Sequence, residues 1–296
     1  MHRTTARLRT GPASQLAALE RQRPEWKAWL RLLAEVRAEL DHPAWAESLG
    51  GADGIMATGP ASAEMPLLEG RTLLVDPARL QRLLRRLARA AADGNSPDAA
   101  ALRHYRPSAT EATRLVEETM GQHPSAPGLA VVAELAALPL FRACERLLQN
   151  SMPTWWPHGH CPICGGWPIL AELRGLDRTR RLRCGRCAGD WVVPWMCCAY
   201  CGEKDHGRLG ALVPGNQGEE LFRVEICAHC GQYLKSIATL QATPSFELLL
   251  RDLETVELDL VALDRGYSRP AGRGVPLTLR VTARPSRPRP RFLRHG

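Results

Sequence analysis

Four Cys-x-x-Cys pairs constrain this chain more than any other feature of its sequence. All of them lie in the second half of the 296 residues, in a stretch that is also rich in glycine and proline. Such a turn lets two thiolates converge on one metal ion, at ~2.3 Å for zinc, and a second turn completes a tetrahedral site. The eight cysteines are Cys161, Cys164, Cys184, Cys187, Cys198, Cys201, Cys227 and Cys230.

The gaps between the pairs predict how they combine. Nineteen residues separate the first pair from the second and 25 separate the third from the fourth, whereas only ten separate the second from the third. The first gap matches the spacing of zinc ribbons, and a hairpin accommodates the longer one. We therefore predict two four-cysteine sites in tandem, with sequential pairing. Four thiolates suit zinc or iron, and spacing does not distinguish these ions.

The residue after each pair also bears on the metal interpretation. Gly165, Gly202 and Gly231 follow the second cysteine of three pairs. Glycine adopts positive φ easily, and this conformation turns backbone N–H groups towards the sulfurs. Ala188 takes this position after Cys187, so we expect that turn to be less ideal and more open.

Other uses of the cysteines are disulfides and redox catalysis. The cytosol keeps thiols reduced, and a redox Cys-x-x-Cys normally opens a helix after a strand, whereas these pairs lie in Gly-rich turns. We interpret Cys144 and Cys197 as ordinary buried thiols. Because four thiolates complete each site, we expect the neighbouring histidines to be surface side chains; they are His158, His160, His206 and His229.

The sequence pattern changes near residue 150. Before it, apolar side chains recur at helical spacing, with helix starts at Pro24 and Asp76, and Pro139 should kink or shorten the last helix. Beyond it, short alternating runs such as Trp191–Met196 and Leu221–Ile226 favour strands, until a helical stripe begins at Pro244 and ends at Gly266.

These patterns predict an α+β fold with an N-terminal helical domain, two tandem zinc-ribbon β modules and a C-terminal helix. The tail is rich in arginine and proline, and we expect it to be disordered. The expected parts are a helical domain over 1–150, a first metal-binding module over 151–192, a second over 193–242, a closing helix over 243–268 and a basic tail over 269–296.

Positive charge raises the alternative of a zinc-ribbon nucleic-acid-binding protein. The net charge is +8, but the last 26 residues hold seven arginines and no acid. Arginines also cluster between the first two cysteine pairs, where such a ribbon would need basic and aromatic residues. We favour the interpretation that they screen a four-cysteine site with a divalent ion, whose formal charge is −2, and expect no nucleic-acid partner. They are Arg174, Arg178, Arg180, Arg181, Arg183 and Arg186.

Catalysis and membrane insertion find no support in the sequence. It contains no P-loop, no H-E-x-x-H and no G-x-S-x-G motif, and four cysteine ligands leave no metal position open for a substrate. We therefore expect a protein that is not an enzyme. No run approaches the ~18 apolar residues of a membrane span, and the N-terminal residues lack the apolar core of a signal peptide, so we expect a cytoplasmic location.

The cysteine-rich block resembles the formate dehydrogenase accessory (FdhE) family. The resemblance is carried by "WWPHGHCPICGGWP", "RCGRCAGDWVVPWMCCAYCG" and "EICAHCGQYLK", and it extends back to "PLLEG" and forward to "DLETVELDLVALDRGYSR". It implies a helical N-terminal domain and two rubredoxin-like modules, with the eight cysteines as metal ligands. It also implies a cytoplasmic maturation factor or chaperone that binds the catalytic subunit of respiratory formate dehydrogenase before export.

Overall fold

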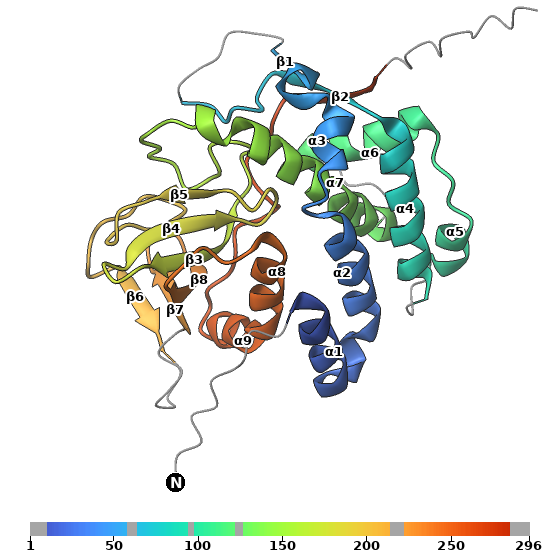
Figure 1. The fold of residues 1–296 in the computed structure, drawn as a ribbon. Helices are drawn as coiled ribbons and strands as arrows, with labels where there is room; N and C mark the ends of the chain where they lie inside the picture. Colours follow the sequence, from blue (N-terminus) through green and yellow to red (C-terminus); the bar gives the residue numbers. More distant parts are fainter. Residues whose placement is uncertain (1–10, 58–63, 94–97, 122–126, 214–221, 285–296) are drawn as a thin grey trace, which may run out of the picture.

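The computed structural model describes residues 11–57, 64–93, 98–121, 127–213 and 222–284. Helices fill one side of the molecule and a six-stranded sheet the other, with α8 and α9 beside the sheet (Figure 1). The predicted α+β class is confirmed. Among the described helices, none is both long and apolar enough to span a membrane.

The two predicted helix starts lie where the sequence indicates, although α1 begins earlier, at Pro12. Asp76 precedes Pro77 and accepts a hydrogen bond from the Ala78 backbone N–H at 2.9 Å, which caps α4. Pro24 opens a short 3-10 turn, Pro24–Trp26, that leads into α2. The helices of this part are α1 Pro12–Gln22, α2 Lys27–Glu39, α3 Ala44–Leu49, α4 Pro77–Ala92, α5 Ala99–Arg103, α6 Ala109–Gly121 and α7 Pro127–Leu148.

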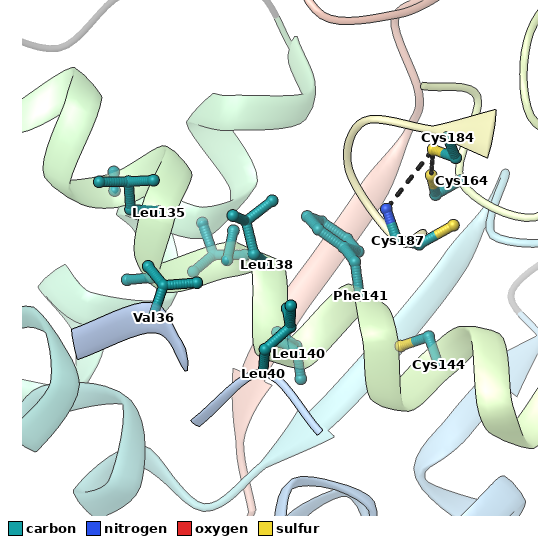
Figure 2. Close-up of a cluster of buried hydrophobic side chains, with 14 of the residues drawn as sticks. Val36, Leu40, Leu135, Leu138, Leu140, Phe141, Cys144, Cys164, Cys184 and Cys187 are labelled. Atoms are coloured by element: carbon teal, nitrogen blue, oxygen red, sulfur yellow. Dashed lines mark hydrogen bonds between the residues drawn. The ribbon is translucent and has the colours of Figure 1, made fainter. Parts of the chain in front are cut away.

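Helix α7 is the centre of the helical part. It continues through Pro139, so of the two predicted effects of this proline, a kink or a shorter helix, the shorter helix is wrong. The neighbours Leu138 and Leu140 are 5% and 0% exposed, and burial on both sides of the proline offsets the lost backbone hydrogen bond. Figure 2 shows this part of α7 between Val36 and Leu40, at the end of α2, and the cysteines of the first module.

The six-stranded sheet joins the two predicted modules into one structure. Each contributes three strands, in the order β5-β4-β3-β8-β7-β6. The modules meet where Ala171–Arg174 of β3 pairs in parallel with Ser236–Thr239 of β8. This contact, which the sequence did not predict, closes an edge of each three-stranded unit. The strands are β3 Pro168–Arg174, β4 Thr179–Cys184, β5 Asp190–Val192, β6 Leu209–Leu212, β7 Phe222–Cys227 and β8 Gln232–Thr239.

Two strand predictions need adjustment. The strand expected over Trp191–Met196 is only β5, because Pro194 cannot donate to the ladder. The strand expected over Leu221–Ile226 corresponds to β7, although Leu221 lies outside the described residues.

The single closing helix is two helices, α8 Ser245–Glu254 and α9 Val256–Asp264, with a break at Thr255. In α8, Leu248 is buried with Leu170 and Ile237 of the sheet. In α9, Ala262 is buried instead, while Leu260 is 60% exposed. The break rotates the second helix, so the apolar stripe predicted over both does not form one buried face.

The prediction of a disordered tail from residue 269 is wrong for the described part of that segment. Leu279–Ala283 forms β9, which pairs in parallel with β2, Arg71–Val75, while β1, Ile55–Ala57, lies on the other side of β2. Leu279 and Val281 are 6% and 3% exposed. Apolar residues at every second position therefore give this stretch a buried face despite its arginines. Residues 285–296 lie outside the described chain.

Candidate metal centres

The structure brings the eight paired cysteines together in two groups of four, following the sequential pairing expected from the gaps. Within each group, the sulfurs all lie within 4.8 Å of one another. In the first cluster, Cys161 Sγ lies 3.6 Å from Cys187 Sγ, and Cys164 Sγ lies 3.4 Å from Cys184 Sγ. Two turns thus face each other across a small space.

The second cluster repeats this arrangement in the other half of the sheet. Cys198 Sγ lies 3.7 Å from Cys230 Sγ, and Cys201 Sγ lies 3.8 Å from Cys227 Sγ. Four sulfurs held tetrahedrally at ~2.3 Å from one ion would be about 3.8 Å apart. Both clusters could therefore hold one metal ion each, with four thiolates and no open position.

All four turns share one backbone conformation. Gly165, Gly202 and Gly231 have φ between 67° and 75°, and each donates its N–H to the carbonyl oxygen of the first cysteine of its pair. Ala188 adopts the same conformation, with φ 59° and a hydrogen bond of 3.1 Å to the Cys184 carbonyl oxygen. The turn after Cys187 is therefore closed like the others, contrary to expectation, at the cost of a strained Cβ.

Backbone N–H groups point at the sulfurs, as the turn conformation requires. The Arg186 and Cys187 N–H groups donate to Cys184 Sγ at 3.3 and 3.4 Å. Burial raises the pKa of the Cys161 and Cys187 thiols. Burial also acts to raise the pKa of Cys184, but hydrogen bonds from the other three thiols and the backbone lower it below its ordinary value. One buried thiolate surrounded by three other buried cysteine side chains is an unfavourable arrangement that a cation would relieve.

The two clusters differ in access to water. In the first cluster no cysteine is more than 1% exposed. In the second, Cys201 is exposed, Cys198 and Cys230 are half-buried, and only Cys227 is buried. The first cluster belongs to the main hydrophobic core together with Phe141 of α7, whose ring lies next to the labelled cysteines in Figure 2.

Distant segments fix the first turn of the first cluster. Leu67 and Leu68, in the "PLLEG" stretch, donate backbone hydrogen bonds to the carbonyl oxygens of Pro162 and Ile163 at 2.8 and 2.9 Å. From the other end of the chain, the Val275 N–H donates to the Gly165 carbonyl oxygen at 2.9 Å. The turn is therefore held by two segments that lie about a hundred residues before it and about a hundred residues after it in the sequence.

The histidines lie outside both clusters. His206 and His229 are exposed, as expected, but His158 and His160 are partly buried and stack on each other with ring centroids 5.0 Å apart. Burial and the neighbouring His158 lower the pKa of His160 to about 4. The expectation of surface histidines is thus wrong for this pair, because Trp156 lies against both rings.

The two unpaired cysteines also differ from each other. Cys144 on α7 is fully buried, as expected, and burial raises the pKa of its thiol. Cys197, which was also expected to be buried, is half-exposed.

The arginine group between the first two pairs contacts acids and carbonyls. Arg183 is buried and pairs with Glu172, which also pairs with Arg174. Arg181 pairs with Asp190 at 2.8 Å, and Arg186 donates to the Cys164 carbonyl oxygen at 3.2 Å. Most of these charges hold the sheet together, a role that neither the screening nor the nucleic-acid interpretation anticipated.

This chain is similar in sequence and fold to known proteins. Residues 196–275, which contain the second cluster and both closing helices, match the family described as "FdhE, C-terminal domain". The resemblance to the FdhE family is confirmed. A "Protein FdhE homolog" of Stutzerimonas stutzeri is 33% identical over 114 residues, which cover 38% of this chain and 36% of that one. "Protein FdhE" of Escherichia coli O127:H6 is 29% identical over 112 residues, 37% and 35% of the two chains.

The similarity in sequence covers only part of the FdhE relatives, whereas the similarity in fold covers most of both chains. Their sequence matches span only about a third of the curated proteins named above. The crystal structure of the FdhE protein from Pseudomonas aeruginosa superposes with a TM-score of 0.53 at 23% identity, covering 89% of this chain and 93% of that one. The FdhE-type fold therefore extends well beyond the cysteine-rich block.

Proposed function

We propose that this chain is an accessory protein that matures formate dehydrogenase in the cytoplasm by binding its catalytic subunit before export. The observation that carries the proposal is the match of 196–275 to the FdhE C-terminal domain, over the segment that builds the second cysteine cluster. The eight cysteines would hold two ions, zinc or iron, and these ions would stabilise two short β units.

The same geometry supports a role without catalysis. Each cluster offers four thiolates to one ion, so a tetrahedral centre has no position for a substrate. The arginines of the first module are engaged by carboxylates, which leaves few of them for phosphate groups. Both observations favour a protein-binding role over an enzyme or a nucleic-acid-binding ribbon.

The test is association of the full-length chain with the catalytic subunit of formate dehydrogenase from the same cell. The proposal expects a complex by size-exclusion chromatography, and loss of formate dehydrogenase activity in cells without this chain. Unimpaired activity in such cells, together with no complex, would reject the accessory role. Salt-resistant, sequence-selective DNA binding would favour the nucleic-acid alternative.

A further inference from the structure

A cavity of about 170 Å³ lies beside the second cysteine cluster. Its floor is one face of the sheet, where the register places Ala211 of β6 beside Glu225 of β7 and Leu234 of β8. Its wall is the segment that follows β5, including Trp195 and Met196. The opposite face of these strands is covered by α9, so only this face is open.

The wall is held in place by a buried arginine. Arg180, which is 2% exposed, donates to the carbonyl oxygens of Pro194 and Cys197 at 3.0 and 3.1 Å. Its guanidinium also pairs with Glu225 at 2.5 Å. The cavity is therefore preformed, and the charges of Arg180 and Glu225 offset each other within it.

Large apolar side chains are exposed at its mouth. Trp195 is 43% exposed and Met196 is 46% exposed. The Arg223 guanidinium carbon lies 5.7 Å from the centroid of the Trp195 ring, which orients the indole and leaves a positive charge at the rim. Tryptophan, methionine and arginine at a preformed pocket are typical of sites that receive an anchor side chain of a partner protein.

The cavity volume decides what can enter. Small-molecule and cofactor sites measure ~300–1,000 Å³, so this cavity is too small for them. A cavity of about 150 Å³ accommodates benzene, which approximates the ring of a phenylalanine. One large apolar side chain therefore fits, and the positive rim favours a carboxylate beside it.

We propose that this cavity binds a peptide segment of the partner protein, with one Phe, Leu or Met side chain inside it and an acidic residue against Arg223. The inference rests on the proposed function, since the partner is the formate dehydrogenase catalytic subunit. It assigns the partner contact to the face formed by Ala211, Trp195 and Arg223, next to the exposed cysteine cluster.

The experiment measures binding of the full-length chain to the isolated catalytic subunit, and to overlapping peptides that cover that subunit. Ala211 is exposed, so Ala211→Phe fills the cavity from its floor without disturbing the core, and Trp195→Ala removes its wall. Leu176→Ala is the matched control, because Leu176 is 95% exposed on the β3–β4 turn and does not line the cavity. Metal content per chain is measured in every variant to show that the second cluster is intact.

We expect both cavity variants to weaken binding by about tenfold or more while Leu176→Ala does not. We also expect the bound peptides to carry a large apolar residue beside Asp or Glu. Arg223→Glu should weaken the same peptides, and replacing their acid by Lys should restore binding. Undiminished binding by both cavity variants would overturn this inference while leaving the accessory function intact. Failure of the unaltered chain to bind the subunit would overturn both.

Discussion

Gly166 lies so close to the first cysteine cluster that a side chain there would displace a sulfur. A Cβ at this position would be 2.8 Å from Cys184 Sγ and 3.4 Å from Cys164 Sγ. The grouping of the eight cysteines into two clusters could be predicted from the sequence, because their spacing fits the geometry of a four-thiolate site. The need for glycine at position 166 could not be predicted from the sequence, because it depends on the sulfur of Cys184, 18 positions later in the chain.

We predict that Gly166→Ala releases the ion of the first cluster and leaves the second occupied. Elemental analysis should then give about one metal per chain in place of two. Gly207→Ala is the control, because a Cβ there meets only Asp205 Oδ1 at 3.4 Å, an ordinary contact. Two metals per chain in Gly166→Ala would contradict the geometry described for the first cluster.

Access to water predicts different rates of metal loss. The buried first cluster is shielded by the core, whereas Cys201 exposes the second to solvent. A colorimetric chelator should therefore remove two equal portions of metal, a fast one from the second cluster and a slow one from the first. The fast portion should be absent in Cys201→Ser, which has lost that ion already. A single rate for both ions would show that exposure does not control exchange.

At the scale of elements, α9 is attached to the sheet by a buried charge network. Lys235 of β8 is 1% exposed and pairs with Asp259 of α9 at 2.7 Å and with Asp252 of α8 at 2.8 Å. Burial acts to raise the pKa of Asp259, but Arg269 and Lys235 hold it below its ordinary value. Asp259 therefore stabilises the fold above about pH 4, and this contribution is lost as the pH falls towards its lowered pKa.

We predict that Asp259→Asn lowers the free energy of unfolding by roughly 2 kcal/mol at neutral pH, because it removes a charged partner of a buried lysine. Urea unfolding at several pH values checks this. The difference in the free energy of unfolding between the variant and the parent should become smaller below about pH 4, because Asp259 becomes protonated in the parent. Asp264→Asn, on the exposed side of the same helix, should change little. A difference that grows in acid would have the wrong sign for this mechanism.

Helix starts were predictable because each depends on neighbouring residues such as Asp76 and Pro77. The division of the closing helix and the strand at Leu279–Ala283 were not, because both depend on partners far away in the sequence. The arginines around β9 suggested a solvated tail. In the structure, Leu279 and Val281 are buried where β9 pairs with β2.

At the scale of the whole molecule, the first module and the helices share one hydrophobic core. Cys161, Cys164, Cys184 and Cys187 belong to the same cluster of buried residues as α4 and α7. The sequence suggested separate units along the chain, since nothing local in it indicates the β3–β8 pairing or the packing of α7 on the first cluster. The second cluster lies outside this shared core, at the far half of the sheet.

Truncation tests how far the ends of the chain contribute to this shared core. Removing residues 285–296 leaves β9 in place and gives the reference chain. Removing 278–296 also deletes β9, uncovers β2, and should lower the melting temperature by several degrees. The comparison of the two truncated chains by thermal unfolding isolates the strand. Equal melting temperatures would mean that β9 adds nothing to the N-terminal sheet.

We have proposed that this chain binds the formate dehydrogenase catalytic subunit, and we expect both cysteine clusters to hold a metal ion in that complex. Native mass spectrometry of the two proteins purified together tests both parts in one spectrum. We predict a complex whose mass exceeds that of its polypeptides by two zinc or iron ions for each copy of this chain. Absence of a complex, or a complex in which this chain carries no metal, would contradict the account.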